Sequence, residues 1–391
     1  MTGNCVPDVD ETAQALAVRH QAPPCDPRFA PPTGSRATPP DGSVRRAERL
    51  LLLSGEGHGG FADEARARPW ERDTIVNVWS TTKTVTSLAV LMLADRGLVD
   101  VDAPVAAYWP EFAANGKEQV LVRHVMSHSS GVAGWNAPFA VADMYDLERS
   151  TALLAAQAPW WEPGTVSGYH ALNYGHLLGE VVRRVSGKSL TGFVASEIAG
   201  PLGADFQVGA KPADWARCAQ IIPPPPLPLD TASLDPDSVL VKTLSGPPAD
   251  AAAANSEGWR LAEIGAANGH GNARSVARVM SALTLGGTVD GVRLLSPETI
   301  GHVFREQTHG TDLFLGVPIR FGIGYALPEP ASIPFLPEGR VCFWGGWGGS
   351  VIIMDLDRGV TISYMMNKMQ PGLVGSDNAA AYVSAVYKLL G

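Results

Sequence analysis

A serine and a lysine lie three residues apart in VWSTTKTV, the stretch from Val78 to Val85. In a helix, residues three apart share a face, so the Lys83 amine can reach the Ser80 hydroxyl. A lysine accepts that proton only if burial or a nearby cation lowers its pKa. The pair is therefore either a nucleophile with its base or, as the structural alternative, only the polar start of a helix.

The elements expected around this pair favour chemistry. Residues 73–79 have the pattern of a strand, and residues 80–96 carry apolar positions at helical spacing. Ser80 would then lie at the positive end of a helix dipole, where an anion is stabilised. A lysine has the wrong charge for this first turn, so Lys83 needs a reason other than helix stability.

The segment 78–112 resembles the nucleophile region of the serine β-lactamase and penicillin-recognising superfamily, and in particular its esterase branch, the family VIII carboxylesterases. Residues 122–132, VRHVMSHSSGV, resemble the H-x-S-G loop of that superfamily. The resemblance covers roughly residues 62–370. It implies that Ser80 is the nucleophile and Lys83 its base.

A second motif surrounds Tyr169. Residues 161–182 resemble the segment that carries Y-x-N in β-lactamases, which here is Tyr169-His170-Ala171. The resemblance implies that Tyr169 relays a proton between nucleophile and leaving group. A phenolate of ordinary pKa about 10 needs a nearby cation, which Lys83 would supply. Tyr174 is the alternative phenol, with core packing as its default role.

Ala171 departs from the β-lactamase pattern. The asparagine of Y-x-N helps to hold the amide of a β-lactam, and an alanine side chain neither donates nor accepts a hydrogen bond. This departure favours an ester over a β-lactam. Asn173 is the nearest asparagine, and we expect it to cap the helix that begins at Tyr174.

The third motif is FWGGWGGSVIIMD, residues 343–355, which resembles the W-G-G variant of the β-lactamase K-T-G motif. The resemblance implies an oxyanion hole made by the main-chain N–H groups of Ser80 and Trp347. Consecutive glycines let the backbone approach a ligand closely, although a bulge in a core strand is the structural alternative. The segment contributes these site candidates: Trp344, Gly345, Gly346 and Trp347.

Aromatic side chains gather in the sequence before Tyr169. Trp135, Trp160 and Trp161 belong to the region that we expect to be inserted into the fold. Core packing is the default role of each. If the site lies between two lobes, these rings can line an apolar pocket for the acyl or alcohol part of a substrate.

Strand patterns at both ends of the chain and helical patterns between them predict an α/β (α+β) fold. The resemblance implies a β-lactamase-like antiparallel sheet flanked by helices, with an inserted helical lobe. We expect an α/β domain from residues 1–85 and 290–391 and a mainly helical domain from residues 86–289. The active site would lie between them.

Composition excludes several classes of function. The 391 residues carry a net charge of −9, and the densest basic run, residues 182–188, is short, so no nucleic-acid partner is expected. The most apolar stretch, residues 88–94, cannot span a membrane. We expect a reduced, cytoplasmic protein, because no C-x-x-C pair and no basic-then-apolar leader pattern occur. The cysteines are far apart: Cys5, Cys25, Cys218 and Cys342.

Neither a metal nor another cofactor is expected. His124 and His128 have the four-residue spacing of helical metal ligands, but no third ligand lies near them in the sequence, so we interpret them as structural histidines. No G-x-G-x-x-G opens a strand-helix unit, and GKS at residues 187–189 lacks the leading glycine of a P-loop.

The motifs and the resemblance together imply a serine hydrolase that cleaves carboxylic esters of small or medium size through an acyl-serine. An acyltransferase with an alcohol or amine acceptor would use the same residues. A β-lactamase or D-amino-acid peptidase, and a catalytically silent binding protein, are further alternatives. The expected partner is a small-molecule ester, and the sequence leaves open whether the chain is a monomer or a homo-oligomer.

Overall fold

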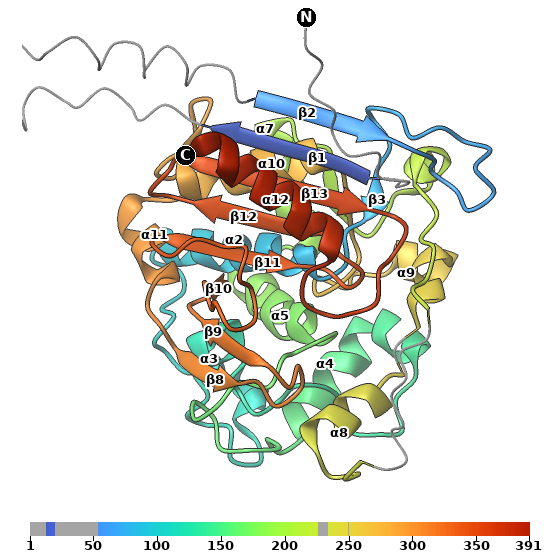
Figure 1. The fold of residues 1–391 in the computed structure, drawn as a ribbon. Helices are drawn as coiled ribbons and strands as arrows, with labels where there is room; N and C mark the ends of the chain where they lie inside the picture. Colours follow the sequence, from blue (N-terminus) through green and yellow to red (C-terminus); the bar gives the residue numbers. More distant parts are fainter. Residues whose placement is uncertain (1–12, 20–53, 226–233, 249) are drawn as a thin grey trace, which may run out of the picture.

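Figure 1 presents a computed structural model of the chain, which describes residues 13–19, 54–225, 234–248 and 250–391. An eight-stranded sheet runs across the molecule, and all its neighbouring strands are antiparallel. In spatial order its strands are β2 (Ser54–Gly59), β1 (Ala13–Arg19), β13 (Val360–Met366), β12 (Val351–Asp355), β11 (Val341–Gly345), β10 (Ala326–Leu327), β9 (Pro318–Phe321) and β8 (Thr308–Thr311).

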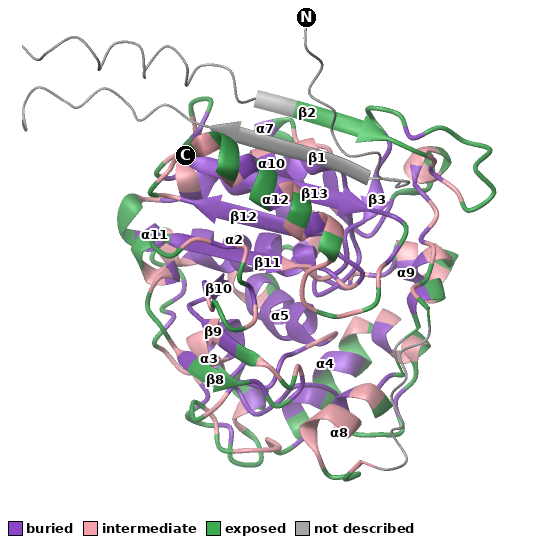
Figure 2. Ribbon diagram, viewed as in Figure 1, coloured by how far each residue is buried: buried purple, intermediate pink, exposed green. Residues whose placement is uncertain are grey.

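The central strands are apolar because helices cover both faces of the sheet. Every residue of β12 and β13 is buried, as Figure 2 shows. Figure 1 places α12 (Asp377–Leu390) on one face and α10 (Ala273–Thr284) on the other. On the α12 side, the rings of Tyr364 and Tyr382 lie 6.2 Å apart, and on the α10 side Thr284 hydrogen-bonds to Thr361.

Helix α2 (Thr82–Asp95) lies in the core, and its first twelve residues are all buried. It packs against α5 (Tyr174–Ser186), which in turn contacts α3 (Val122–Met126). The remaining α-helices of the described residues are α4 (Leu147–Ala156), α6 (Leu190–Phe193), α7 (Gly200–Leu202), α8 (Val239–Ser245), α9 (Glu257–Leu261) and α11 (Pro297–Val303). A small sheet joins β3 (Val76–Asn77), β5 (Gly269–Gly271) and β4 (Phe206–Val208), and a separate pair joins β6 (Thr288–Val289) and β7 (Val292–Arg293).

The predicted fold class is confirmed, since an antiparallel sheet from both ends of the chain is flanked by helices. The two-lobe division stays a prediction, and α10, from the range expected to be helical, packs on the large sheet. The strand expected over residues 73–79 is reduced to Val76–Asn77. The apolar run of residues 47–55 also predicts a strand. Its residues 47–53 lie outside the described residues, and its last two begin β2.

The N-terminal segment contributes a strand to the large sheet. The first 47 residues show no sustained periodicity, yet β1 within them pairs with both β2 and β13. Within the described residues, no helix combines the length and hydropathy needed to cross a bilayer.

Candidate active site

Ser80 lies in a tight turn between β3 and α2. The turn is a 3₁₀ segment, Trp79–Thr81, and Trp79 adopts a φ of +50°, which is unusual for a bulky residue. The Trp79 ring packs against Trp259 and Trp347 at centroid distances of 5.6 and 5.2 Å. These aromatic contacts hold the turn that presents the Ser80 side chain, which remains partly exposed.

Lys83 is buried one helical turn beyond Ser80, with 2% of its surface exposed. Its amine nitrogen lies 3.0 Å from Ser80 Oγ and 2.8 and 2.9 Å from the carbonyl oxygens of Ala171 and Ala266. Burial lowers the pKa of Lys83 well below its ordinary value. The amine can therefore be neutral.

The partners of a neutral Lys83 fix its orientation. A neutral amine has two hydrogens and one lone pair, and a carbonyl oxygen can only accept a hydrogen bond. The two hydrogens therefore go to the Ala171 and Ala266 carbonyls. The lone pair is left facing the Ser80 hydroxyl, which is the arrangement of a base with its proton donor.

Tyr169 closes the group from a distant loop. It is 6% exposed, its ring centroid lies 4.6 Å from the Lys83 amine nitrogen, and its hydroxyl accepts a 3.0 Å hydrogen bond from Trp344 Nε1. Burial raises the pKa of Tyr169 above its ordinary value, while hydrogen bonds with Ser80 and Trp344 oppose that rise. The structure thus brings together Ser80, Lys83, Tyr169 and Trp344.

These pKa shifts change one expectation. The sequence interpretation places a cationic Lys83 beside a phenolate. Burial instead favours the neutral form of both groups, because it lowers the pKa of Lys83 and raises that of Tyr169. A neutral amine and a neutral phenol hold the same number of protons as the ion pair, so the two groups still act as one coupled unit.

The W-G-G segment is pinned to the Ser80 turn. Gly346 N–H donates to the Ser350 carbonyl at 2.7 Å, and Ser350 Oγ donates to the Val78 carbonyl at 2.9 Å. A Cβ on Gly346 would lie 2.5 Å from the Val78 oxygen and 2.8 Å from Trp79 Cβ. Only glycine permits this approach, and Ser350 is a supporting residue that the motif comparison missed.

Trp347 follows directly and lies beside the same turn through its ring contact with Trp79. No described residue accepts a hydrogen bond from its main-chain N–H. The donor is therefore free for a ligand, as an oxyanion hole requires. Gly345, the last residue of β11, is half-buried, and a Cβ there would lie 2.9 Å from the Ser350 carbonyl oxygen.

Two buried histidines support Tyr169. The His128 ring lies 4.7 Å from the Tyr169 ring, and its Nδ1 accepts from the His170 main-chain N–H at 3.2 Å. His170 Nδ1 donates to the Gly168 carbonyl, so its Nε2 accepts from Ser130 Oγ at 2.6 Å. Burial lowers the pKa of both rings, to about 3 for His170, so they act as neutral packing and hydrogen-bonding groups.

The predicted aromatic pocket is only partly supported. Trp135 is a correction: it is 1% exposed, stacks on Phe139 and bonds to the Ser150 carbonyl, so it belongs to the core. Trp160 and Trp161 are half-buried. A Cβ on residue 168 would lie 2.5 Å from the Trp161 ring, so this ring packs over the backbone next to Tyr169.

The structure also tests the roles expected for Asn173 and Tyr174, which follow the second motif. Asn173 occupies the N-cap position of α5 but makes no capping bond, so that prediction is wrong. Its Nδ2 instead donates to the Val132 carbonyl at 2.8 Å. Tyr174 is buried, with its hydroxyl 2.7 Å from Ser87 Oγ, which agrees with its default packing role.

With this geometry established, similarity to known proteins identifies the family. A sequence profile described as Beta-lactamase matches residues 44–386. The chain belongs to the beta-lactamase family. It is 37% identical over 331 residues to "Esterase/beta-lactamase LipL" of Mycobacterium tuberculosis, covering 82% of this chain and 75% of that protein. It is 28% identical over 344 residues to "Esterase EstB" of Burkholderia gladioli, covering 81% and 83%.

A solved structure extends this similarity to the fold. The crystal structure of a family VIII carboxylesterase shares 35% identity with this beta-lactamase-family chain, at a TM-score of 0.82. The match covers 97% of this chain and 92% of that one.

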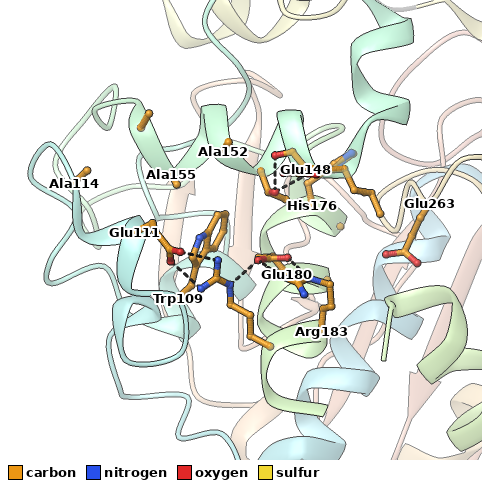
Figure 3. A pocket seen from close by; sticks show the side chains of 16 residues that line it. Trp109, Glu111, Ala114, Glu148, Ala152, Ala155, His176, Glu180, Arg183 and Glu263 are labelled. Atoms are coloured by element: carbon orange, nitrogen blue, oxygen red, sulfur yellow. Dashed lines mark hydrogen bonds and ion pairs between the residues drawn. The ribbon is translucent and has the colours of Figure 1, made fainter. Parts of the chain in front are cut away.

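A separate cavity of about 690 Å³ opens among α4 and α5 of this beta-lactamase-family protein. Figure 3 shows its charged wall, which includes Glu111, Glu180 and Arg183. The Arg184 guanidinium donates hydrogen bonds to both Glu111 and Glu180. Neither Ser80 nor Lys83 nor Tyr169 lines it. The cavity is therefore distinct from the catalytic group, despite its size.

Proposed function

We propose that this chain is a carboxylesterase in which Ser80 attacks the ester carbonyl and forms an acyl-serine. The observation that carries the proposal is the Lys83 amine, buried and held by two carbonyls so that its lone pair faces Ser80 Oγ. A desolvated lysine of lowered pKa is a recognised way to activate a hydroxyl nucleophile. The relatives named esterases, and the family VIII carboxylesterase structure, support this reaction class.

The proposed reaction has two steps. Lys83 takes the Ser80 proton as Oγ bonds to the carbonyl carbon, and the N–H groups of Ser80 and Trp347 stabilise the oxyanion. As the bond from carbon to the alcohol oxygen breaks, Tyr169 gives that oxygen its proton and regains one from the Lys83 ammonium. Water then resolves the acyl-serine by the reverse sequence, releasing the acid and restoring the neutral pair.

The proposed substrate is a carboxylic ester of small or medium size. The Ala171 side chain offers no hydrogen bond to a substrate amide, and its carbonyl is already bonded to Lys83. We also propose that the only partner needed is this small molecule, without nucleic acid or membrane. A reducing, cytoplasmic location is part of the proposal, supported by the buried free thiols of Cys218 and Cys342.

Replacing the nucleophile tests the proposal. We expect Ser80→Ala to lower kcat/KM for p-nitrophenyl acyl esters by more than roughly 1,000-fold, because no other hydroxyl of the described residues is hydrogen-bonded to the Lys83 amine. A fluorophosphonate probe should label wild type at Ser80 and leave this variant unlabelled. The measurements are ester hydrolysis across acyl lengths and mass spectrometry of the labelled peptide.

Ser196 provides a matched control. Its Oγ also lies 2.9 Å from a lysine amine, that of Lys188, but it is exposed and Lys188 is paired with Glu197. Ser196→Ala should keep full activity and full labelling at Ser80. Ester hydrolysis retained in Ser80→Ala, or labelling at Ser196 in place of Ser80, would remove the proposed function.

A further inference from the structure

A buried carboxylate clamps the loop that carries Tyr169. Asp312, in the turn between β8 and β9, is 0% exposed. Its Oδ1 accepts hydrogen bonds from the main-chain N–H groups of Phe314 and Leu315, each at 2.9 Å, and of Tyr169 at 3.1 Å. One oxygen thus closes its own turn and also holds the backbone of a residue 143 positions away.

The turn contacts the Tyr169 loop at two more points. The Leu313 main-chain N–H donates to the Ser167 carbonyl at 2.9 Å. The Phe314 ring lies 6.0 Å from the Tyr169 ring, centroid to centroid. These contacts fix the loop before Tyr169, its backbone and its ring, so the turn determines where the phenol points.

The second carboxylate oxygen has a different environment. Oδ2 is buried, and no described residue donates a hydrogen bond to it. Among the described residues, no lysine or arginine forms an ion pair with Asp312. The negative charge of Asp312 also raises the pKa of Tyr169, the direction that keeps the phenol protonated. Because no donor lies at Oδ2, the NH₂ group of an asparagine at position 312 can occupy that place without facing another hydrogen-bond donor.

We propose that Asp312 is a positioning residue for Tyr169. By holding the Tyr169 main-chain N–H and the Phe314 turn together, it keeps the phenol aligned with Ser80 and with the oxygen of the departing alcohol. The inference rests on the proposed function, in which Tyr169 donates the proton to that oxygen. Misplacement of such a group by about 1 Å can cost roughly 100-fold in rate.

The leaving group offers a selective test. Ethyl and p-nitrophenyl esters of one acid form the same acyl-serine, so their kcat/KM values differ only in acylation. Ethoxide is a poor leaving group and needs the Tyr169 proton, whereas p-nitrophenolate leaves largely without it. We expect Asp312→Ala to lower kcat/KM roughly 10- to 100-fold for the ethyl ester and much less for the p-nitrophenyl ester. Asp312→Asn, which keeps the accepting oxygen, should stay within about threefold of wild type on both.

A double-mutant cycle separates positioning from general stability. In a Tyr169→Phe background, Asp312→Ala should cause no further loss on the ethyl ester, although it should lower Tm as before. Asp355→Asn is the control, because Asp355 is also 0% exposed and accepts a main-chain N–H, that of Arg358. It should lower Tm and leave the ratio of the two esters unchanged.

Other outcomes overturn the inference. Equal losses on both esters, a full additive loss in the Tyr169→Phe background, or an Asp312→Asn defect as large as that of Asp312→Ala would each do so. If Asp312→Ala does not fold, Phe314→Ala removes the neighbouring ring and must show the same ester selectivity. If Tyr169→Phe alone leaves ethyl ester hydrolysis unchanged, the proposed proton donor is wrong, whatever Asp312 does.

Discussion

At the scale of single residues, two buried lysines differ in the hydrogen-bond partners of their amines. Lys117 is bonded to three carbonyls, those of Ala114, Ala155 and Gln157, so all its neighbours suit the three hydrogens of an ammonium. Lys83 has two carbonyls and one hydroxyl that can donate. Burial lowers the pKa of both, to about 8 for Lys117, but only Lys83 has a partner that gains from its lone pair.

This difference predicts the acid limb of the pH profile. A base works only when unprotonated, so kcat/KM should fall as the pH drops through the lowered pKa of Lys83 and should reach a plateau above it. Lys83→Arg should be inactive at every pH, because a guanidinium stays charged. The measurement is kcat/KM against pH for a p-nitrophenyl ester.

The control is Lys117→Arg, because Lys117 is also buried but its amine is hydrogen-bonded to carbonyls and not to a serine. It should leave the position of the acid limb unchanged. Substantial activity in Lys83→Arg would mean that the residue serves as a fixed positive charge, which contradicts its role as the base.

The sequence could reveal only part of this group. Four residues could be predicted because their side chains belong to motifs that occur in the expected order, and the structure brings them together: Ser80, Lys83, Tyr169 and Trp344. The sequence gives no signal for the Ala266 carbonyl as a partner of Lys83, because every residue has a main-chain oxygen. The roles of Asp312 and Ser350 could not be predicted from the motifs, because neither side chain has an assigned role in them. Both roles depend on contacts between segments far apart in the chain.

At the scale of elements, the end of β11 and the start of α2 share one small contact. The W-G-G segment reaches the Ser80 turn only because position 346 has no side chain. The Ser80 turn also shortens the strand expected over residues 73–79. That strand ends at Asn77, and the chain bends at Trp79. Periodicity alone could not predict that bend, because the packing of Trp79 on Trp259 and Trp347 imposes it.

We therefore expect Gly346→Ala to damage both stability and activity. The added methyl would clash with Ser350 Oγ, the Val78 carbonyl and Trp79 Cβ, an overpacking that costs about 1–3 kcal/mol and shifts Ser80. Thermal melts and kcat/KM on one ester measure the two effects. Gly301→Ala is the control: Gly301 lies in α11 with open space around it, so alanine should stabilise by about 0.5–1 kcal/mol without changing kcat/KM.

At the scale of the whole molecule, we expect the buried central strands of the large sheet to contribute much of the folding stability, because all residues of β12 and β13 are buried. Ile362, in β13, is 0% exposed, between strands β12 and β1. Ile362→Ala should lower the free energy of unfolding by about 2–5 kcal/mol, through lost burial and the cavity left behind. The activity of the folded fraction at low temperature should stay near wild type, since the strand partners of Ile362 are Ala17 and Ile353, neither of which belongs to the catalytic group.

Leu389 is the matched apolar control, because it lies in α12 with 67% of its surface exposed. Leu389→Ala should change stability by no more than about 0.5 kcal/mol. Urea unfolding followed by fluorescence measures both variants. A small effect of Ile362→Ala would show that the sheet centre is not where folding stability resides.

The bonds around the Lys83 amine connect positions 88 and 183 residues away along the chain. A nascent, truncated or misfolded polypeptide does not hold those oxygens beside the Lys83 amine, so its Ser80 hydroxyl is not activated. Chemical competence thus arrives only with the finished tertiary structure. Stoichiometric capture of Ser80 by an irreversible inhibitor consequently counts native molecules in a preparation, and gives each batch an internal gauge of its own quality.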